Sequence, residues 1–597
     1  MTGGPLRPLA SVLSARRTGE SPDAFERERS RRRREEIRDH ARRRAEGRLL
    51  VLSAFFLCAF CAIGLRMGSL AASGPAESRG TAAVGNIVAQ RADIVDRRGR
   101  VLATNLHTHS LYARPRIMID PEGAARSLAE IFPGLDEEEL LGRFEGKRKF
   151  LWIRKRISPE QMQAVHEIGE PGLMFGPRET RLYPNGAIAA HVLGGSAYGR
   201  EGVGAAEIVG VAGVEKSFDG FLRDPSEGGR PLELSLDLAV QTAIERVLGG
   251  GMRLMNAKGA AAVLMDARSG EIFAMASLPD FDPNRRPAPP AGGDPSDSPL
   301  FNRAVQGLYE LGSTFKTFAV AQALELGIVD VDSVVDASAP MEWGRHSIGE
   351  FQGGNFGPKL PVSDVLVRSS NVAAARLALR IGGERQRAFL GDLGILEPSP
   401  VELVEASAAR PLFPERWSEI STITASYGHG VSVSQLHLAA AYAGLLNGGM
   451  RVTPTLLKRG REEPGPRILS KEVSADLRAM LRRAVTDPAG TGNLGDVPGY
   501  GVGGKTGTAD KAKERGGYHD GKVVATFAAV FPIDDPRYVL VVTLDEPAGV
   551  SDGELRRAAG WTAAPVAAEA IRRAGPLLGI RPEIETAPPD RLSLTRN

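Results

Sequence analysis

Three short segments carry side chains whose types and order are suited to acyl transfer. Ser313-Thr314-Phe315-Lys316 has the pattern S-x-x-K, Ser369-Ser370-Asn371 has S-x-N, and Lys505-Thr506-Gly507-Thr508 begins with K-T-G. A serine hydroxyl becomes a useful nucleophile when a neighbouring base takes its proton. A lysine can be that base only if burial or nearby cations lower its pKa. The ordered set predicts a serine nucleophile, a lysine base and two polar elements that close the site.

The first segment has the spacing of a helix. Ser313 and Lys316 are three residues apart, so on a helix their side chains lie on the same face. A mostly apolar stretch follows and ends at Gly327, which predicts a helix that begins near the serine. The backbone N–H groups and the positive end of the helix dipole then lie beside Ser313. The ordinary alternative is a helix N-cap with an incidental lysine, and the two other motifs weigh against it.

The other two motifs are predicted on a turn and on a strand. Ser369-Ser370-Asn371 separates two amphipathic stretches, 361–367 and 372–381, so we expect a turn between helices. Helix capping is the ordinary role of such residues and is compatible with catalysis. Lys505-Thr506-Gly507-Thr508 is predicted on an edge strand that could pair with an extended peptide. Gly507 would let a ligand backbone approach closely, and a plain strand and turn is the alternative.

The motifs resemble those of class B penicillin-binding proteins. The likeness runs from about Arg91 to Pro565 and favours the division-specific (septal) transpeptidase of Gram-negative bacteria over the elongation-specific branch. The further segments that carry it are 91–99, 181–184, 191–194, 213–219, 302–305, 416–418 and 427–430. One departure is Leu311, where the family usually has proline, and it concerns the rigidity of the loop before the serine.

The resemblance implies how the site would work. Ser313 would attack the penultimate D-Ala carbonyl of a peptidoglycan stem peptide, with Lys316 as general base, and form an acyl-enzyme. The backbone N–H groups of Ser313 and Thr508 would form the oxyanion hole, where one donor is worth about 10²–10³ in rate. The amine of a second stem peptide would then accept the acyl group. β-Lactams are expected to acylate the same serine.

The resemblance also implies the residues that bind the substrate. Ser369 and Asn371 would assist proton transfer and hold the substrate amide, and Lys505 and Thr506 would hold its terminal carboxylate. Gly507 and Thr508 would belong to the strand that pairs with the peptide.

The N-terminal region predicts a membrane anchor. Leu49 to Leu65 is a 17-residue run without charge, and extended to Leu70 it reaches 22 residues, or about 33 Å as a helix. The 48 residues before it contain 14 arginines and 8 acidic residues. Positive charge flanks the cytoplasmic side, so the tail is expected inside and the remainder in the periplasm, on the inner membrane. A cleaved signal peptide is the alternative, and the long charged leader disfavours it.

Cysteine and histidine usage predicts no disulfide and no metal site. The only cysteines, Cys58 and Cys61, lie inside the apolar run, so the exported part has none. The nine histidines show no H-E-x-x-H or similar spacing, and His191 and His429 are interpreted as structural. No cofactor is expected. The arginine-rich tail is explained by the membrane orientation, and no base-reading motif suggests nucleic acid.

We therefore predict an α+β protein with a single N-terminal transmembrane helix, a non-catalytic pedestal domain and a transpeptidase domain built on an antiparallel sheet flanked by helices. The predicted bounds are 1–48 for the cytoplasmic tail, 49–70 for the transmembrane helix, 71–230 for the pedestal, 231–576 for the transpeptidase domain and 577–597 for the C-terminal tail.

The sequence disfavours several other functions. A serine β-lactamase would share the motifs but would be smaller and soluble and would need a deacylating base. The anchor and pedestal argue against a D,D-carboxypeptidase, and a β-lactam-sensing receptor would carry further membrane helices and a zinc-protease motif. The intact motifs argue against a non-enzymatic divisome scaffold with a weakly active or dead site. The elongation-specific paralogue is the nearest alternative. By family resemblance, the expected partners are a SEDS-type glycosyltransferase and other division proteins, contacted through the membrane helix and the pedestal.

Overall fold

The computed structural model describes residues 53–64 and 91–583, except 202–205, 461–462, 464, 514–515 and 552, together with the single residues 17, 19, 27 and 31. Contacts divide the chain into two compact units, Met1–Ile87 and Val88–Asn597. Each unit is described by itself below.

In the first unit, residues 53–64 form a helix in which Cys58 and Cys61 are exposed. None of the helices in the described part of the chain has both the length and the apolar character needed to span a bilayer. The predicted span 49–70 extends beyond the described residues on both sides. The arginine-rich tail, apart from four single positions, also lies outside them.

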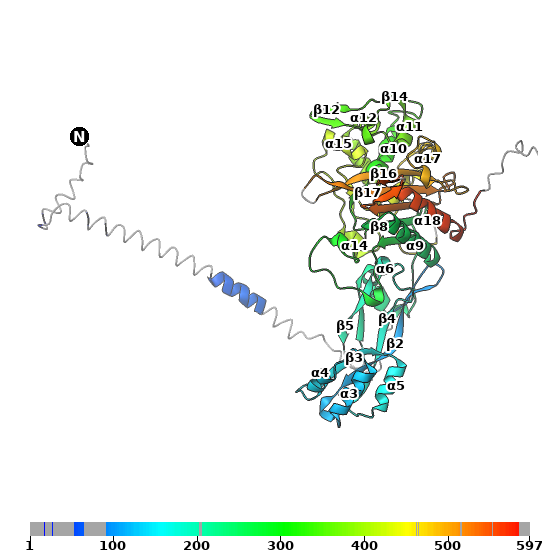
Figure 1. Cartoon of the computed structure of the whole chain (residues 1–597). Coiled ribbons are helices and arrows are strands. Elements are labelled where there is room, and N and C mark those ends of the chain that lie inside the picture. Colours follow the sequence, from blue (N-terminus) through cyan, green and yellow to red (C-terminus); the bar gives the residue numbers. More distant parts are fainter. Residues whose placement is uncertain are drawn as a thin grey trace, which may run out of the picture. The chain divides into compact units, whose positions relative to one another are not determined.

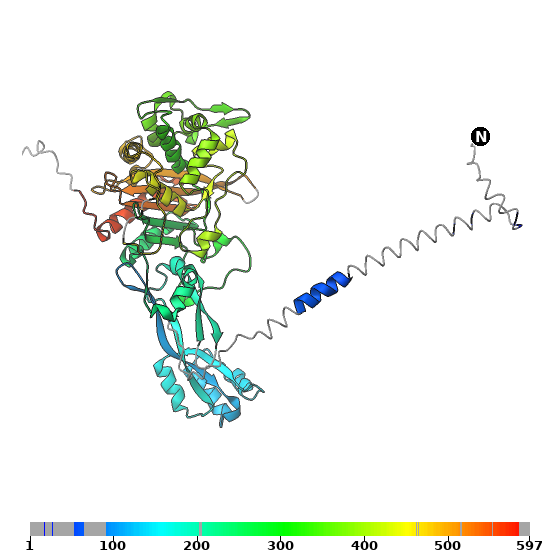
Figure 2. The ribbon, with the colours of Figure 1, turned by 180° about the vertical axis from the view of Figure 1, so that it is seen from behind.

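The second unit begins with a mixed α/β region, residues 91–233, here called the pedestal. Its five-stranded sheet has the order β3-β2-β1-β7, and β4 also pairs with β2. The long strands β2 and β4 run antiparallel side by side (Figures 1 and 2). The strands are β1 (Ile94–Val95), β2 (Val101–Ala113), β3 (Leu151–Ile157), β4 (Leu173–Leu182) and β7 (Leu232–Glu233). The helices that pack on this sheet are α3 (Pro121–Ile131), α4 (Glu137–Phe144) and α5 (Pro159–Glu167).

The rest of the pedestal is a hairpin and short helices held by a buried ion-pair network. The Arg91 guanidinium lies 2.6 Å from the carboxylate of Glu215, and the Arg181 guanidinium lies 2.7 Å from the same carboxylate. All three side chains are buried, and Asp219, 2.7 Å from the Arg91 guanidinium, supplies a second negative charge to the network. The elements are α6 (Ala190–Leu193), β5 (Gly195–Glu201), β6 (Ala206–Ala212), α7 (Gly213–Ser217) and α8 (Asp219–Arg223), with the 3-10 turns η1 (Pro115–Ile117) and η2 (Pro225–Glu227).

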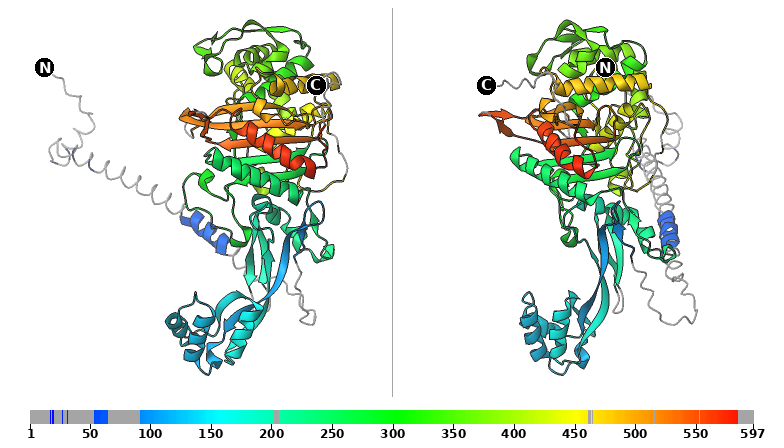
Figure 3. Two further views of the ribbon diagram at one scale, coloured as in Figure 1. Left: turned by 45° about the vertical axis from the view of Figure 1, so that its right-hand side comes forward. Right: turned by 90° about the vertical axis from the view of Figure 1, so that its right-hand side faces the viewer.

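Residues 234–583, here called the sheet domain, contain a five-stranded antiparallel sheet of order β16-β17-β18-β8-β9. The predicted antiparallel sheet flanked by helices is confirmed. Its strands are β8 (Gly259–Asp266), β9 (Ile272–Leu278), β16 (Gly503–Ala512), β17 (Tyr518–Phe531) and β18 (Tyr538–Asp545). The helices α9 (Leu238–Leu254) and α18 (Ala563–Leu577) cover one face, and α18 is the red helix beside the green α9 in Figure 3.

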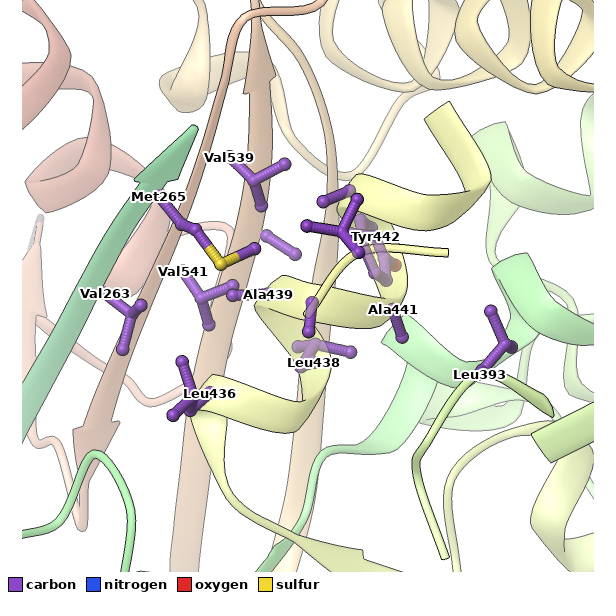
Figure 4. Close-up of a cluster of buried hydrophobic side chains, with 14 of the residues drawn as sticks. Val263, Met265, Leu393, Leu436, Leu438, Ala439, Ala441, Tyr442, Val539 and Val541 are labelled. Carbon is purple, nitrogen blue, oxygen red and sulfur yellow. The ribbon is translucent and has the colours of Figure 1, made fainter. Parts of the chain in front are cut away.

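Successive residues of each strand point to opposite faces of the sheet, so the sheet separates two cores. In β8, Ala262 and Leu264 pack toward α9 and α18, whereas Val263 and Met265 pack toward α16 (Gln435–Leu446). Figure 4 shows Val263 and Met265 with Val539 and Val541 of β18 against the side chains of α16. Every residue of α16 is buried, as expected for a helix that is apolar at most positions, although it includes Gln435 and His437.

The remaining helices lie on the same side of the sheet as α16. They are α10 (Lys316–Glu325), α11 (Val362–Arg368), α12 (Asn371–Ile381), α13 (Gly383–Asp392), α14 (Val404–Ala408), α15 (Glu419–Ser426) and α17 (Lys471–Thr486). The short strands form the pairs β10 (Tyr309–Glu310) with β15 (Ser432–Val433), β11 (Val334–Ala337) with β14 (Gly357–Pro361), β12 (Met341–Trp343) with β13 (His346–Ile348), and β19 (Gly549–Ser551) with β20 (Glu554–Arg556). The 3-10 turns are η3 (Pro283–Arg285), η4 (Pro295–Asp297), η5 (Gly312–Phe315), η6 (Phe351–Gly353) and η7 (Asn493–Gly495).

Candidate active site

The S-x-x-K segment lies where η5 passes directly into α10. The Nζ atom of Lys316 donates a hydrogen bond to the Oγ atom of Ser313 at 2.9 Å. Lys316 is 1% exposed, so its amine is removed from water while it contacts the hydroxyl. The predicted pairing of serine and lysine on one helical face is therefore present in the structure.

The S-x-N segment forms the predicted turn between α11 and α12. Ser369 has a left-handed backbone with φ of 58°. Lys316 Nζ donates to the carbonyl oxygen of Ser369 and, at 3.1 Å, to its Oγ. Ser370 is the N-cap of α12, because its Oγ accepts from the backbone N–H of Ala373 at 3.0 Å. Asn371 faces the pocket, and its Nδ2 donates to the carbonyl of Gly349 at 2.9 Å.

The K-T-G segment lies on β16, which is an edge strand of the sheet as predicted. Lys505 is fully buried, and its Nζ donates to Ser369 Oγ at 3.0 Å. The Ser369 hydroxyl thus accepts hydrogen bonds from both lysines. Thr506 Oγ1 lies 2.7 Å from Thr491 Oγ1, and Thr508 Oγ1 accepts from the N–H of Ala559 at 2.9 Å.

The reason for glycine at position 507 differs from the prediction. A Cβ atom there would lie 2.2 Å from the carbonyl oxygen of Leu311 and 2.8 Å from Cγ2 of Thr314. The missing side chain therefore lets the protein's own turn η5 approach the strand, and no ligand is needed to explain it. Gly312 meets the strand in the same way, because a Cβ atom there would lie 2.7 Å from the carbonyl oxygen of Thr508. This close contact brings the serine beside Thr508 on β16.

Burial changes the proton affinity of both lysines. Burial lowers the pKa of Lys316 well below its usual value, the neighbouring Lys505 cation lowers it further, and Glu350 opposes the change. Burial lowers the pKa of Lys505 to about 7. A neutral Lys316 can accept the serine proton, and this is the condition that an exposed lysine does not meet at neutral pH.

A pocket of about 630 Å³ opens above these groups. The predicted residues Ser313, Ser369, Asn371, Thr506 and Thr508 line it, whereas Lys316, Lys505 and Gly507 do not belong to its lining. The lysines lie buried beneath it and Gly507 lies against η5. The assigned roles of all eight residues stay predictions.

Several pocket residues escaped the sequence-based prediction. They are Phe351, Phe356, Arg368, Tyr427, His429, Asn493, Leu494, Asp510 and Trp561, among others. Arg368 and Asp510 lie beside the motifs in sequence, and Tyr427 and His429 belong to the segment 427–430 that carries the family resemblance, whereas no local pattern marks the others. His429, for which the sequence favours a structural role, lines the pocket, with its ring centroid 5.3 Å from that of Tyr427.

The other histidine singled out in the sequence, His191, does not belong to the pocket lining. His191 is buried, its Nε2 lies 2.8 Å from the carbonyl of Pro299, and burial lowers its pKa to about 4. Within the described residues, no group of three or more His, Cys, Asp or Glu side chains is arranged to hold a metal ion.

The fold and the site define a class of protein: an antiparallel sheet between helices, with a serine, two buried lysines and an edge strand around one pocket. The chain matches the family described as "Penicillin binding protein transpeptidase domain" over residues 260–572, and "Penicillin-binding Protein dimerisation domain" over residues 86–235. The chain belongs to the class B penicillin-binding proteins, as its motifs predicted.

Curated relatives match along most of their length. The chain is 36% identical over 550 residues to the "Probable peptidoglycan D,D-transpeptidase FtsI" of Caulobacter vibrioides, covering 90% of each chain. It is 32% identical to the "Probable peptidoglycan D,D-transpeptidase PenA" of Neisseria gonorrhoeae, covering 77% of this chain and 80% of the relative. It is 28% identical to the "Peptidoglycan D,D-transpeptidase FtsI" of Escherichia coli, covering 78% and 80%.

Solved structures agree with the sequence relatives. The crystal structure of penicillin-binding protein 3 from Mycobacterium tuberculosis, complexed with aztreonam, superposes with a TM-score of 0.61 at 26% identity. It covers 83% of this chain and 97% of the other. The same protein complexed with ampicillin gives a TM-score of 0.62.

Proposed function

We propose that this chain is a serine D,D-transpeptidase that cross-links peptidoglycan stem peptides during septum formation. Relatives named as peptidoglycan D,D-transpeptidases support the reaction, and the likeness to two chains named FtsI supports the septal branch. The observation that carries the proposal is the 2.9 Å contact between Ser313 Oγ and the buried amine of Lys316. It supplies a nucleophile and its base in the same pocket.

In the first half-reaction, the proton of Ser313 passes to Lys316 Nζ while Oγ attacks the penultimate D-Ala carbonyl. An ester bond forms between serine and the carbonyl carbon, the D-Ala–D-Ala amide bond breaks, and the leaving amine takes the proton from Lys316 Nζ. The N–H groups of Ser313 and Thr508 stabilise the oxyanion, and such stabilisation makes a large contribution to the rate of many acyl transfers. In the second half-reaction, the acceptor amine attacks the ester, a new amide forms and the serine hydroxyl is restored.

The substrate would be held by the groups around the Ser369 turn and the edge strand. Lys505 and Thr506 bind the terminal carboxylate, and Ser369, whose hydroxyl contacts both lysines, assists proton transfer. Asn371 holds the substrate amide. The outer edge of β16 pairs with the peptide backbone by β-augmentation.

A labelling experiment tests the nucleophile. Full-length protein treated with a fluorescent penicillin should become covalently labelled, and Ser313→Ala should reduce labelling at least about 10³-fold. Ser407→Ala is the matched control, because this exposed serine of α14 only donates to the Val404 carbonyl. Mass spectrometry should place the adduct on Ser313. An adduct on another residue, or full labelling of the alanine variant, would refute the assignment.

The cellular role needs a separate test. Depletion should give filaments if the chain works at the septum, and round cells if it serves elongation. A wild-type chain that takes no label would favour the scaffold alternative. A chain that rapidly releases a hydrolysed β-lactam would favour a β-lactamase.

We further infer that residues 49–70 anchor the chain in the inner membrane, with the N-terminus in the cytoplasm and residues 71–576 in the periplasm as pedestal and transpeptidase domain. The apolar run and the arginine-rich leader support this arrangement. Carbonate-resistant membrane association and protease access from the periplasm only are expected. A SEDS-type glycosyltransferase and other division proteins are the proposed partners, and co-purification that survives deletion of the pedestal would argue against contact through it.

A further inference from the structure

A buried carboxylate outside the three motifs contacts the S-x-N turn. Glu350 follows strand β13 and is 8% exposed. Its Oε1 accepts from the hydroxyl of Ser370 at 2.5 Å and from the N–H of Val372 at 3.2 Å. Its Oε2 accepts from the N–H of Asn371 at 2.6 Å. Both oxygens are thus occupied by groups of one short segment at the start of α12.

The backbone that this segment must hold is unfavourable on its own. Ser369 is one of few residues other than glycine with positive φ in the described chain. Such a conformation persists when the surrounding contacts over-determine it. Glu350 contacts each of the three residues that follow Ser369, and the neighbouring Gly349 carbonyl accepts from the Asn371 side chain. The loop 349–350 is therefore the external support of the turn.

The turn at Ser369 also positions Lys316, the proposed base. The carbonyl and the hydroxyl of Ser369 both accept hydrogen bonds from Lys316 Nζ. The direction of that carbonyl depends on the backbone angles of the turn. Any relaxation of the turn would therefore move the acceptors that keep Lys316 beside Ser313.

We propose that Glu350 is a positioning residue of this site: its carboxylate fixes the left-handed turn so that Ser369 holds Lys316 against the nucleophile. The inference rests on the proposed function. The adjacent Phe351 lines the pocket, so the same loop links the substrate-binding wall to the base.

The charge of Glu350 has a second effect on the base. Burial and the Lys505 cation lower the pKa of Lys316, and the Glu350 anion opposes them. These two are the charged groups beside Lys316, one from β16 and one from the loop after β13, while Arg368 of α11 lies exposed at the pocket. Removal of the negative charge should therefore lower the pKa of Lys316 further.

The test compares variants of the full-length protein by the second-order rate constant for acylation by a fluorescent penicillin across pH. Glu350→Gln should lose about 10²-fold, the loss typical of a misplaced catalytic group. The acid limb of its pH–rate profile should move to lower pH, because the anion that favours protonated Lys316 is gone. Glu350→Asp keeps the charge, so its acid limb should stay at the wild-type position and part of the rate should return.

Glu402→Gln is the matched control. The Glu402 carboxylate also accepts from a hydroxyl and a backbone N–H, those of Thr455 and Leu456, at 2.6 and 2.8 Å. It should change thermal stability without moving the acid limb.

A folded Glu350→Gln variant with the wild-type rate, or with a lower rate and an unmoved acid limb, would overturn the proposal. If that variant does not melt cooperatively, Ser370→Ala replaces it, since it removes one link between the carboxylate and the turn. Slower acylation is then expected, and a wild-type rate would overturn the proposal. A wild-type protein that takes no label would count against the proposed function itself. Labelling of the wild type therefore tests the proposed function, and the difference between wild type and variants tests the role of Glu350.

Discussion

In the proposed mechanism, the two buried lysines of the site need opposite protonation states. Lys316 must be neutral to take the serine proton, whereas Lys505 must be charged to bind a carboxylate. Both pKa values are lowered by burial, that of Lys505 to about 7. We therefore expect a bell-shaped pH profile for the second-order rate constant of acylation. The rate rises as Lys316 loses its proton and falls above about pH 7 as Lys505 loses its own.

The variant Lys505→Arg separates the two limbs. A guanidinium stays charged throughout the range, so the alkaline limb should disappear while the acid limb remains, although the altered geometry lowers the maximum rate. Stopped-flow or gel-based acylation rates between about pH 5 and pH 10 measure this. An alkaline limb that survives in the arginine variant would show that another group controls it.

At this scale, the sequence predicts the groups that react but not those that support them. Ser313 and Lys316 are neighbours along a helix, so their contact follows from local geometry alone. Glu350 contacts the S-x-N turn from about twenty residues earlier in the chain, with η6, β14 and α11 between them, and Trp561 enters the pocket from beyond the K-T-G strand. Contacts between residues so far apart in the chain cannot be predicted from a local sequence pattern.

Among the elements, α9 and α18 provide a sharp packing test. Gly250 and Gly251 are neighbours in α9, but only one faces α18. A Cβ atom at Gly251 would lie 2.6 Å from Cγ2 of Val566, whereas one at Gly250 meets nothing within 4 Å. Gly251→Ala should destabilise the domain by about 1–3 kcal/mol through overpacking.

Gly250→Ala is the control and should stabilise it by up to about 1 kcal/mol, since alanine favours a helix more than glycine does. Thermal unfolding of the two variants measures the difference. Equal shifts of both would contradict the close contact between these helices.

The elements also show where local reasoning succeeds and where it does not. The antiparallel sheet flanked by helices could be predicted because apolar runs such as those of β8 and β18 mark strands that are buried on both faces. The predicted reason for glycine at position 507, the close approach of a ligand backbone, was wrong. The group that comes close is η5, nearly two hundred residues away in sequence. The sequence can indicate that another group lies close to a glycine, but only the fold identifies that group.

For the whole molecule, the division into two units predicts independent behaviour. Contacts separate Met1–Ile87 from Val88–Asn597, and the pocket lies entirely in the second unit. A protein that lacks residues 1–87 should fold and be labelled by penicillin at a rate within about twofold of the full-length chain, as expected for a domain with its own core. Circular dichroism and the labelling rate test this, and an unlabelled, folded truncation would contradict it.

The edge strand of the pocket has a consequence for antibiotic resistance. The outer edge of β16 offers main-chain groups, and every residue type except proline supplies the same N–H donor. Substitutions along the strand therefore leave in place the donors that a drug imitating the peptide would use. We expect selection by such drugs to favour changes in exposed pocket residues such as Phe351 and Trp561, whose side chains, unlike the main-chain donors of the strand, differ from one residue type to another.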